Sequence, residues 1–412
     1  MFSLIKFKVI ATLATILFLL TACSNGEETK ETAIPSETAL GNLLFHDKNL
    51  SFNRTQSCAT CHNPQHAFID TRDNEASPLG VSLGDDNFSI GVRNTPTISY
   101  AKFFPTFSAL PAGTDADENG FIGGLFLDGR EADLKGQAGG PPLNPVEMNM
   151  PDKASVIARI KENNNYIKAF EKFYGENVFD DTDKAYLKMT MAIASFEKTD
   201  EFAPFDSKWD RYLEGDYELS FTELTGKSVF FADQNSSCVN CHVMNDVNNA
   251  RIKKQTFTNS KYFNIGVPKN IALIDAITAK DLHPGFLANH DMGLFENPAV
   301  DDPNLKGKFK TPTLRNVAVT GPYMHNGVFK ELKTTLEFYD FRSTIDGSRR
   351  PLNPETGMPW VETPFAHTID HGKLGMQKLS DAEIEGLECF LRLLTDKKFE
   401  HLIPDTGLDC SS

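Results

Sequence analysis

Two copies of the pentapeptide Cys-x-x-Cys-His are the residues whose types and spacing carry the clearest chemistry in this chain. They are Cys58, Cys61 and His62 in the first copy and Cys238, Cys241 and His242 in the second. This spacing is typical of c-type haem attachment, in which both cysteine sulfurs form thioethers to the porphyrin and the histidine becomes the proximal iron ligand. Zinc or a disulfide is the alternative for a single Cys-x-x-Cys, but zinc needs four ligands close together and neither motif has a second cysteine pair nearby. We therefore expect two covalently bound haem c groups, one in each half of the chain.

The first 22 residues have the pattern of an export signal. Lys6 and Lys8 precede an apolar run, Val9 to Leu20, that is too short to span a bilayer as a stable helix. The next residues resemble a lipobox, and cleavage before Cys23 would leave a lipid-modified cysteine that anchors the protein, with residues 23–37 as a flexible tether. An ordinary secretory signal with an incidental cysteine is the alternative. We expect a periplasmic lipoprotein held by Cys23 to a bacterial membrane, the outer membrane in preference.

Seven cysteines are present. Four belong to the haem motifs and Cys23 to the lipobox, which leaves Cys389 and Cys410. The periplasm is oxidising, so these two could form a disulfide. The sequence leaves the pairing open, because it does not give the separation of the two Cα atoms.

The chain is acidic, with a formal net charge of −15 at pH 7. A negative surface repels nucleic acid, so we expect no nucleic-acid partner. The same charge suits a small cationic electron carrier.

The expected fold class is all-α, with two cytochrome c-like domains whose long loops wrap the haems. About 375 residues follow the tether, which is enough for two domains. Because one haem motif lies in each half, we place the domains at 38–200 and 201–412, with the boundary near 198–209. The first domain would hold the His62 haem and the second the His242 haem.

Apolar periodicity predicts the main helices. The predicted helices span residues 153–173, 183–197, 220–231, 330–341 and 380–395. Ser220 with Glu223, and Ser380 with Glu383, have the spacing of a capping box at a helix start. Alternating strand patterns are lacking, and stretches rich in Gly, Pro and Asn at 73–94, 110–124, 246–310 and 340–372 are expected to be loops around the cofactors.

The sequence resembles the bacterial di-haem cytochrome c peroxidase family, which also includes the MauG-type protein-oxidising enzymes. The matching segments keep their order over nearly the whole mature chain. They are Leu40-Gly41, Leu44-Phe45, Asp47, Arg93 to Thr97, Asp128-Gly129-Arg130, Gln137-Ala138, Pro145 to Met148, Pro204-Phe205-Asp206, Lys310 to Asn316 and Pro322 to Gly327.

The resemblance implies different roles for the two haems. The His62 haem would be the peroxide site and the His242 haem the electron relay. Glu147 matches the distal acid–base glutamate and Gln137 the distal glutamine. One buried carboxylate above the iron can take a proton from one peroxide oxygen and return it to the other. Read without the resemblance, Glu147 would be a surface carboxylate and Gln137 a loop hydrogen-bonding residue.

Two further assignments rest on the resemblance. Asn94, Thr320 and Pro322 match a calcium site made of one side chain and two backbone carbonyls, and oxygen ligands suit calcium. Tyr339 occupies the position where many peroxidases of this family have a methionine ligand to the relay haem, whereas MauG-type members have tyrosine. A phenolate would stabilise ferric iron and lower its potential. A turn asparagine and a packed tyrosine are the alternatives. His325 is expected to be a hydrogen-bonding residue of the haem pocket.

Two departures from the family pattern affect the expected chemistry. Leu127 stands where the family usually has a tryptophan between the haems, so electron exchange would lose its aromatic intermediate. Residues 70–91 contain no histidine that could block the first iron, and His66 is too close to His62 to reach the opposite haem face. The His62 haem is therefore expected to be open without prior reduction.

The other histidines and both tryptophans match no functional position. They are expected to be surface or packing residues, and they are His46, His283, His290, His367, His371, His401, Trp209 and Trp360.

The function predicted from these residues is reduction of hydrogen peroxide to water. The electrons would come from a small protein such as a cytochrome c or a cupredoxin. A MauG-type oxidase acting on a partner protein and a di-haem electron-transfer cytochrome without turnover are the alternatives. The sequence leaves a homodimer open.

Overall fold

The computed structural model describes residues 33–110, 120–232, 238–242, 253–343, 348–375 and 378–411. The chain divides into two units, Met1–Ala33 and Ile34–Ser412, and every element below belongs to the second. The predicted signal segment and Cys23 lie outside the described residues, so the lipid anchor stays a prediction. Within the described part of the chain, no helix is both long enough and apolar enough to cross a membrane.

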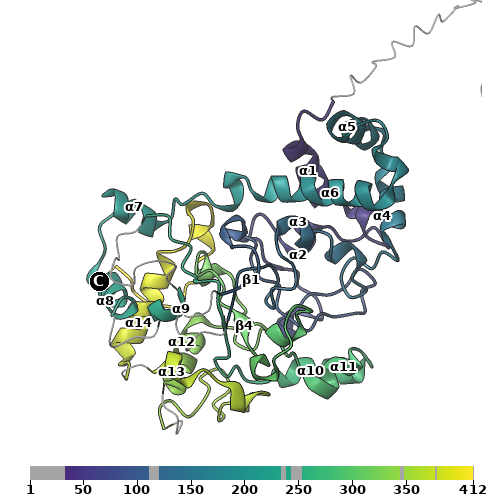
Figure 1. Ribbon diagram of the computed structural model, residues 1–412. Coiled ribbons are helices and arrows are strands. Elements are labelled where there is room, and N and C mark those ends of the chain that lie inside the picture. The colour runs from purple at the N-terminus through teal and green to yellow at the C-terminus, as the bar shows by residue number, and fades with distance from the viewer. Residues whose placement is uncertain are drawn as a thin grey trace, which may run out of the picture. The chain divides into compact units, whose positions relative to one another are not determined.

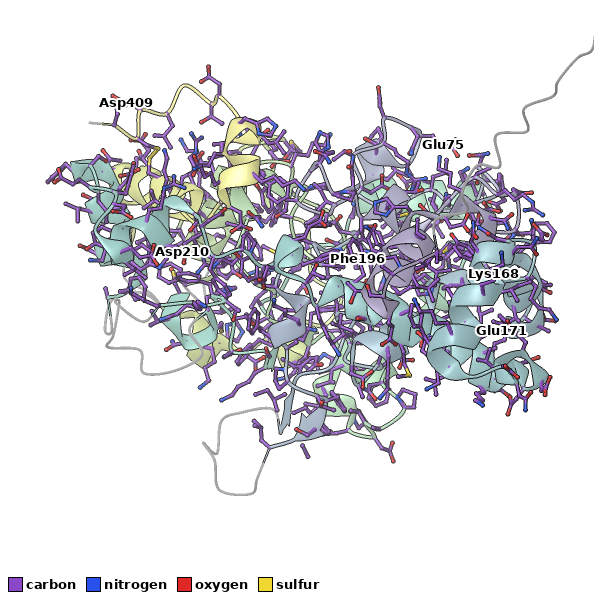
Figure 2. All side chains as sticks on the ribbon, turned by 90° about the horizontal axis from the view of Figure 1, so that it is seen from above. Glu75, Lys168, Glu171, Phe196, Asp210 and Asp409 are labelled. Carbon is purple, nitrogen blue, oxygen red and sulfur yellow. A yellow bond between two sulfur atoms is a disulfide. The ribbon has the colours of Figure 1, made fainter. Side chains whose placement is uncertain are left out.

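Helices α1 (Glu37–His46) and α6 (Thr182–Glu197) form the centre of the N-terminal half (Figure 1). They approach closely because Gly41 has no side chain: a Cβ atom there would stand 1.9 Å from the carbonyl oxygen of Ala192 in α6. The other helices of this half are α2 (Cys58–Cys61), α3 (Leu134–Gln137), α4 (Lys153–Ile160) and α5 (Asn164–Tyr174). Figure 2 shows Phe196 enclosed by other side chains, in agreement with its place in the apolar core of this half.

Helices α8 (Phe221–Phe230) and α14 (Asp381–Arg392) form a similar close pair in the C-terminal half. A Cβ atom at Gly226 would stand 1.7 Å from the carbonyl oxygen of Gly386. Both helices begin with the predicted capping box. The other helices of this half are α7 (Lys208–Glu214), α9 (Cys238–His242), α10 (Ile271–Ala279), α11 (Pro284–Asn289), α12 (Leu332–Arg342) and α13 (His371–Leu374).

Extended structure is scarce in the part of the chain that is described. Strand β1 (Ser108–Ala109) pairs antiparallel with β2 (Phe121–Ile122), and β3 (Tyr262–Phe263) pairs antiparallel with β4 (Phe309–Lys310). Short 3-10 helices lie at Lys48–Leu50, Ser77–Leu79, Ala101–Phe103, Pro141–Leu143, Val178–Asp180, Asp200–Phe202, Leu294–Glu296, Pro303–Leu305, Val317–Val319, Ala366–Thr368 and Lys397–Leu402. The fold is thus mostly helical with few strands, as predicted, whereas the number of haems in each domain stays a prediction.

The single helix predicted over residues 153–173 is wrong, because the chain forms two helices there. Helix α4 ends at Ile160, and α5 begins at Asn164. Asn163 takes extended backbone angles and its side chain accepts a hydrogen bond from the amide of Asn165. An asparagine that bonds the backbone in this way starts a new helix more readily than it continues an old one.

The loop predicted over residues 246–310 is also wrong in part, because it contains α10 and α11. Asn270 caps α10 by accepting from the amide of Leu273. Pro284 is the first residue of α11, where its missing N–H costs nothing. The apolar residues Ile271, Leu273 and Ile277 could have predicted α10 from the sequence.

The two largest apolar cores draw on different parts of the described chain. The first draws on residues 34–202 together with Phe399, and the second on residues 209–394. The cores therefore separate between Phe202 and Trp209. The proposed domain limits, 38–200 and 201–412, stay a prediction.

A buried polar network lies beside these cores. Arg315 is 0% exposed and donates to both carboxylate oxygens of Asp210, at 2.5 and 3.0 Å. The Asp396 carboxylate accepts a hydrogen bond from the hydroxyl of Tyr100 at 2.5 Å and another from the side-chain amide of Asn316 at 2.8 Å. Burial raises the pKa of Asp396 to about 6. The network ties the end of the chain to residues from both halves.

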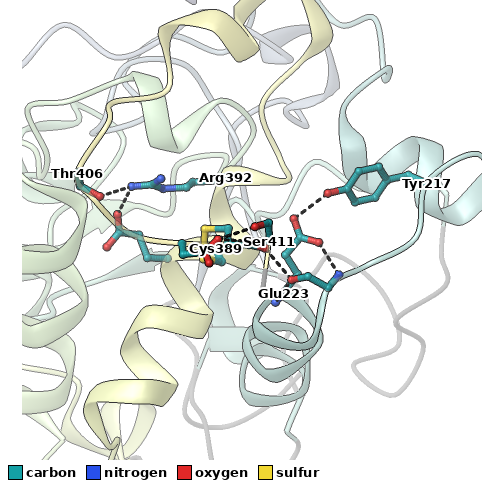
Figure 3. Close-up of a disulfide and its surroundings, with 10 residues drawn as sticks. Tyr217, Glu223, Cys389, Arg392, Thr406 and Ser411 are labelled. Atoms are coloured by element: carbon teal, nitrogen blue, oxygen red, sulfur yellow. Dashed lines mark hydrogen bonds and ion pairs between the residues drawn. A yellow bond between two sulfur atoms is a disulfide. The ribbon is translucent and has the colours of Figure 1, made fainter.

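Cys389 and Cys410 form a disulfide, with their Cα atoms 5.5 Å apart (Figure 3). Cys389 lies on α14, and the carbonyl of Cys410 accepts a hydrogen bond from Ser220 at the start of α8. Glu223 of that capping box also accepts from the hydroxyl of Tyr217 at 2.9 Å. The pairing that the sequence left open therefore fastens the C-terminal segment beside the close helix pair.

We predict that Arg315→Ala lowers the free energy of unfolding by about 3–5 kcal/mol, because it leaves Asp210 buried without its cation. Arg54→Ala is the matched control, since Arg54 and Glu162 form an ion pair whose side chains are 48% and 47% exposed. Its loss is expected to cost no more than about 1 kcal/mol. Denaturant unfolding of both variants checks the difference, and equal losses would contradict the prediction.

Candidate active site

Both haem motifs open into one cavity of about 470 Å³. The structure brings every sequence-predicted site residue to its wall. Those residues are Cys58, Cys61, His62, Asn94, Leu127, Gln137, Glu147, Cys238, Cys241, His242, Thr320, Pro322, His325 and Tyr339. Residues far apart in the sequence thus share one enclosed space, while their individual roles stay predictions.

The two motif histidines have the same hydrogen bond. Nδ1 of His62 lies 3.1 Å from the carbonyl oxygen of Phe68, and Nδ1 of His242 lies 3.1 Å from that of Phe257. A carbonyl only accepts, so Nδ1 carries the proton and Nε2 keeps its lone pair. Burial lowers the pKa of both rings, that of His242 to about 4, which keeps them neutral. A neutral imidazole with a free, oriented Nε2 fits the proximal ligand of a haem.

Phe68 and Phe257 hold these carbonyls through an unusual backbone. Both side chains are 0% exposed, and both residues have positive φ angles, 59° and 52°. Such angles are uncommon for residues other than glycine and are maintained only where packing over-determines them. Sequence reasoning missed both residues, because they follow their histidines by 6 and 15 positions and share no common spacing.

None of the four motif cysteines takes part in a disulfide, and all four are partly buried. Cys58 and Cys61 begin and end α2, whose capping box of Ser57 and Thr60 fixes its start. Cys238 and Cys241 lie on α9. Thiol groups outside any disulfide, beside an oriented imidazole on the wall of a mainly apolar cavity, fit covalent attachment of haem. When bound, haem supplies the redox chemistry that side chains lack.

Of the predicted pair Glu147 and Gln137, Glu147 is the residue that can carry a proton. One carboxylate oxygen of Glu147 accepts a hydrogen bond from the side-chain amide of Asn144 at 2.7 Å. Burial raises the pKa of Glu147, and the positive charge of Arg130 opposes that shift. Gln137 ends α3 and lines the same cavity. Asn144, three residues before Glu147, is an orienting partner that the sequence did not single out.

A second buried carboxylate, Glu197, was also missed. It is the last residue of α6, is 5% exposed and lines the cavity. Its Oε2 atom has no hydrogen-bond partner among the residues that the structure describes. Burial raises its pKa to about 8, so this carboxyl group stays protonated at neutral pH. Nothing in the sequence distinguished it from an ordinary helix glutamate.

Tyr339 faces the cavity from α12 beside the second motif. Burial and the neighbouring thiols of Cys241 and Cys238 raise its pKa. Iron at this position would oppose that shift, because a bound phenolate is deprotonated. The chain brings Tyr339 and His242 to the same cavity wall, as ligation requires, and the ligand role stays a prediction.

His325 stacks on Phe309, with the ring centroids 3.7 Å apart. Burial lowers the pKa of His325 to about 4, so the ring is neutral. Its carbonyl accepts from the amide of Asn94 at 2.8 Å. His325 therefore anchors the segment that carries the predicted calcium ligands.

Asn94 and Pro322 meet directly. The Asn94 side-chain amide lies 2.5 Å from the carbonyl oxygen of Pro322, and Thr320 lines the same cavity. The two atoms of an asparagine amide are assigned from such contacts, so Oδ1 can take the place of Nδ2 by a flip. The residues thus come together as a calcium site needs, and calcium stays a prediction.

A charged cluster surrounds the position of Leu127. The amide of Lys310 donates to the carbonyl of Leu127 at 2.9 Å, and its ammonium group donates to Gly124 at 2.5 Å. Burial lowers the pKa of Lys310 to about 7. Arg93 joins Asp128 of the N-terminal half to Asp291 of the C-terminal half, at 2.5 and 2.6 Å. These groups make the region between the two motifs polar and tightly held.

The loop after the first motif is fastened by helices α10 and α11. Lys280 donates to Glu75 at 2.7 Å and to the carbonyl of Phe88 at 2.9 Å. His283 binds the carbonyl of Ile90 at 2.7 Å, so this histidine fixes the loop. Apolar contacts from Leu273 and Ile277 complete the attachment. His66 bonds to Asn63 within its own turn.

The chain belongs to the di-haem cytochrome c peroxidase family, whose model matches residues 35–218. It is similar to methylamine utilization protein MauG of Paracoccus denitrificans, at 43% identity over 404 residues, which are 96% of this chain and 98% of that protein. Cytochrome c551 peroxidase of Pseudomonas aeruginosa is 31% identical over 71% of this chain and 68% of its own length. The solved structure of the di-haem peroxidase BthA from Burkholderia thailandensis has a TM-score of 0.76 at 28% identity, covering 92% of this chain and 91% of that one.

Family membership makes this protein an oxidoreductase and implies two haem c groups. It also confirms the resemblance drawn from the sequence. The similar proteins include both peroxidases and MauG, so membership alone does not select the substrate.

We predict that Tyr339→Met raises the reduction potential of the His242 haem, because a neutral thioether replaces an anionic oxygen donor. Tyr323→Phe is the control: Tyr323 also lines the cavity, but its hydroxyl donates to the carbonyl of Val317. Redox titration with optical detection checks both variants. An unchanged potential in Tyr339→Met would return this tyrosine to a packing role.

Proposed function

We propose that this protein reduces hydrogen peroxide to water at the His62 haem, with electrons that arrive from a small redox protein through the His242 haem. The observation that carries the proposal is Glu147, a partly buried carboxylate of raised pKa on the wall of the cavity that His62 also lines. Family membership supports it, because peroxidases are among the similar proteins.

Glu147 moves the proton in this proposal. Its carboxylate accepts the proton of one peroxide oxygen and returns it to the other oxygen as the O–O bond breaks. Asn144 holds the carboxylate by its 2.7 Å hydrogen bond, and Gln137 offers an amide to orient peroxide. Burial raises the pKa of Glu147, which makes its carboxylate a better acceptor for the peroxide proton.

A second candidate is oxidation of a partner protein. It is favoured by the 43% identity to MauG over nearly the whole chain, and by tyrosine at position 339. Leu127, which offers no aromatic ring between the two motifs, favours peroxide removal instead. The electron-transfer cytochrome without turnover is set aside, because the chain belongs to an enzyme family.

The remaining assignments accompany the proposal. We infer a periplasmic location with a lipid anchor at Cys23 as the membrane attachment, and a calcium ion at Asn94, Thr320 and Pro322. A cytochrome c or a cupredoxin is the proposed electron donor. A homodimer is compatible with all of these.

Rapid mixing of the ferric protein with hydrogen peroxide, followed by reduced cytochrome c, tests the proposal. Peroxidase function requires that cytochrome c is oxidised in proportion to the peroxide consumed. If cytochrome c stays reduced while a co-purified protein acquires oxidised residues, the second candidate is correct and peroxide removal is not the function.

We predict that Glu147→Gln lowers peroxidase turnover by roughly 10²–10⁴-fold with full haem content, since the proton carrier is lost. Glu197→Gln is the matched control, because Glu197 is a second glutamate of raised pKa that lines the same cavity. The ratio of turnover to haem absorbance measures the effect. If the two variants lose turnover equally, Glu147 has no special role in proton transfer.

We predict that the ferric protein as isolated has one high-spin haem that accepts an external ligand. The loop at 70–91 has no histidine and is fastened by Lys280 and His283, so it offers no ligand to the iron. Electron paramagnetic resonance of the oxidised protein checks this. Two purely low-spin signals would show that another residue closes the site.

A further inference from the structure

An exposed apolar hairpin follows helix α12. Residues 350–361 turn back on themselves through a bridge between Leu352 and Pro359, and the amide of Asn353 donates to the carbonyl of Met358 at 2.8 Å. Leu352, Met358 and Val361 are 48%, 64% and 41% exposed. We call these three side chains the hairpin patch. Large apolar side chains that gather on one exposed segment mark interaction sites more often than scattered ones do.

Trp360 lies beneath the hairpin patch and remains partly exposed. Its ring centroid is 5.5 Å from Phe329, 5.6 Å from Phe338 and 5.6 Å from Phe341, on which it stacks. Its indole N–H donates to the carbonyl of Arg350 at 2.7 Å. Neighbours along an extended segment point to opposite sides, so Trp360 faces inward where Val361 faces outward.

Helix α12 connects this tryptophan to the cavity. Phe338 and Phe341 contact Trp360, and the ring of Phe338 lies 6.1 Å from that of Tyr339. Tyr339 lines the cavity beside the cysteines of the second motif. An unbroken series of ring contacts therefore runs from the surface to the His242 haem site. Indole and phenol groups are also the side chains that lose an electron most readily.

The charges of the hairpin favour a positively charged partner. Arg350 is held by Asp340 and Asp381 in ion pairs. Glu355 and Glu362 are exposed on the same segment, and the whole chain carries a formal charge of −15. Complementary charge steers a partner toward such a surface, and the apolar centre then binds it.

We propose that Trp360 passes electrons from a cationic redox protein, docked on the hairpin patch, to the His242 haem site. This inference rests on the proposed peroxidase function. Hydrogen peroxide takes up two electrons and two protons to become two molecules of water, and two donor molecules supply the electrons singly. Peroxide would draw one electron from the haem held at His242 in each transfer; Trp360 would then replace that electron and regain one from the donor. Its indole proton stays on the bond to Arg350, so no proton has to leave.

Trp360→Phe against Trp209→Phe tests the relay, because these are the two tryptophans of the chain. Trp209 is 1% exposed in the second core and has no access to a partner. For each holoprotein, the rate of peroxide reduction with a basic cytochrome c is divided by the rate with ascorbate. The ratio is expected to fall in Trp360→Phe alone. An unaltered ratio overturns the inference, whereas failure of the parent protein with both reductants overturns the proposed function.

Oxidation of the tryptophans themselves gives a readout that does not depend on turnover. The holoprotein is treated with peroxide without any donor, and peptides are examined by mass spectrometry. Oxygen addition is expected at Trp360 and not at Trp209. Without a donor, Trp360 would not regain the electron that it has lost, and the oxidised ring would then react further. Equal modification of both residues, or of neither, would contradict the relay.

Met358→Lys tests the docking surface. It places a positive charge on the hairpin patch and is expected to weaken binding of the basic cytochrome c by roughly tenfold. Phe221→Lys is the matched control, since Phe221 is 79% exposed and lies on α8, outside residues 350–361. Calorimetry at low ionic strength measures both. Weaker binding in Phe221→Lys alone would place the docking surface on α8 and refute this one.

Discussion

The hydrogen bond from each motif histidine to a backbone carbonyl is the constraint on which the rest of this site depends. It fixes the tautomer of His62 and of His242, and it turns both Nε2 atoms toward one cavity. The carbonyls come from Phe68 and Phe257, which stand in an uncommon backbone conformation that only tight packing maintains. The apolar cores therefore do more than stabilise the chain, because they hold the strained residues that orient the two motif histidines.

The two halves share this histidine arrangement and differ in the other side chains that they bring to the cavity. In each half a pair of helices meets at a glycine, α1 with α6 and α8 with α14. The N-terminal half then adds Glu147, whose raised pKa suits proton transfer, whereas the C-terminal half adds Tyr339, a potential iron ligand. A peroxide-reducing enzyme with an electron relay would need one haem site that is open to peroxide and a second haem site that a side-chain ligand closes.

The sequence was sufficient wherever the chemistry is local. The capping boxes at Ser220 and Ser380 need only four consecutive residues and were predicted correctly. Cys-x-x-Cys-His is equally local, with five consecutive residues, and haem attachment at the two motifs stays a prediction. The helix break at Asn163 was missed because apolar periodicity continues through it. Glu197 and Phe257 were missed for a different reason: their importance comes from burial beside residues distant in sequence, which composition and spacing do not reveal. The disulfide could be predicted only in part. The sequence showed its two cysteines, Cys389 and Cys410, but not the distance between their Cα atoms.

Leu127 need not prevent electron transfer between the two haem motifs, and the side chains around it show why. Leucine cannot carry an electron vacancy, but Phe126 and Phe309 line the same cavity, and Arg130 lies 3.6 Å from the centre of the Phe126 ring. A cation over an aromatic face makes that ring harder to oxidise. Arg93 and Lys310 add positive charge to the same region. The electrostatics of this region therefore oppose an electron vacancy on an intermediate ring, so electrons from the His242 side would cross the gap by direct tunnelling.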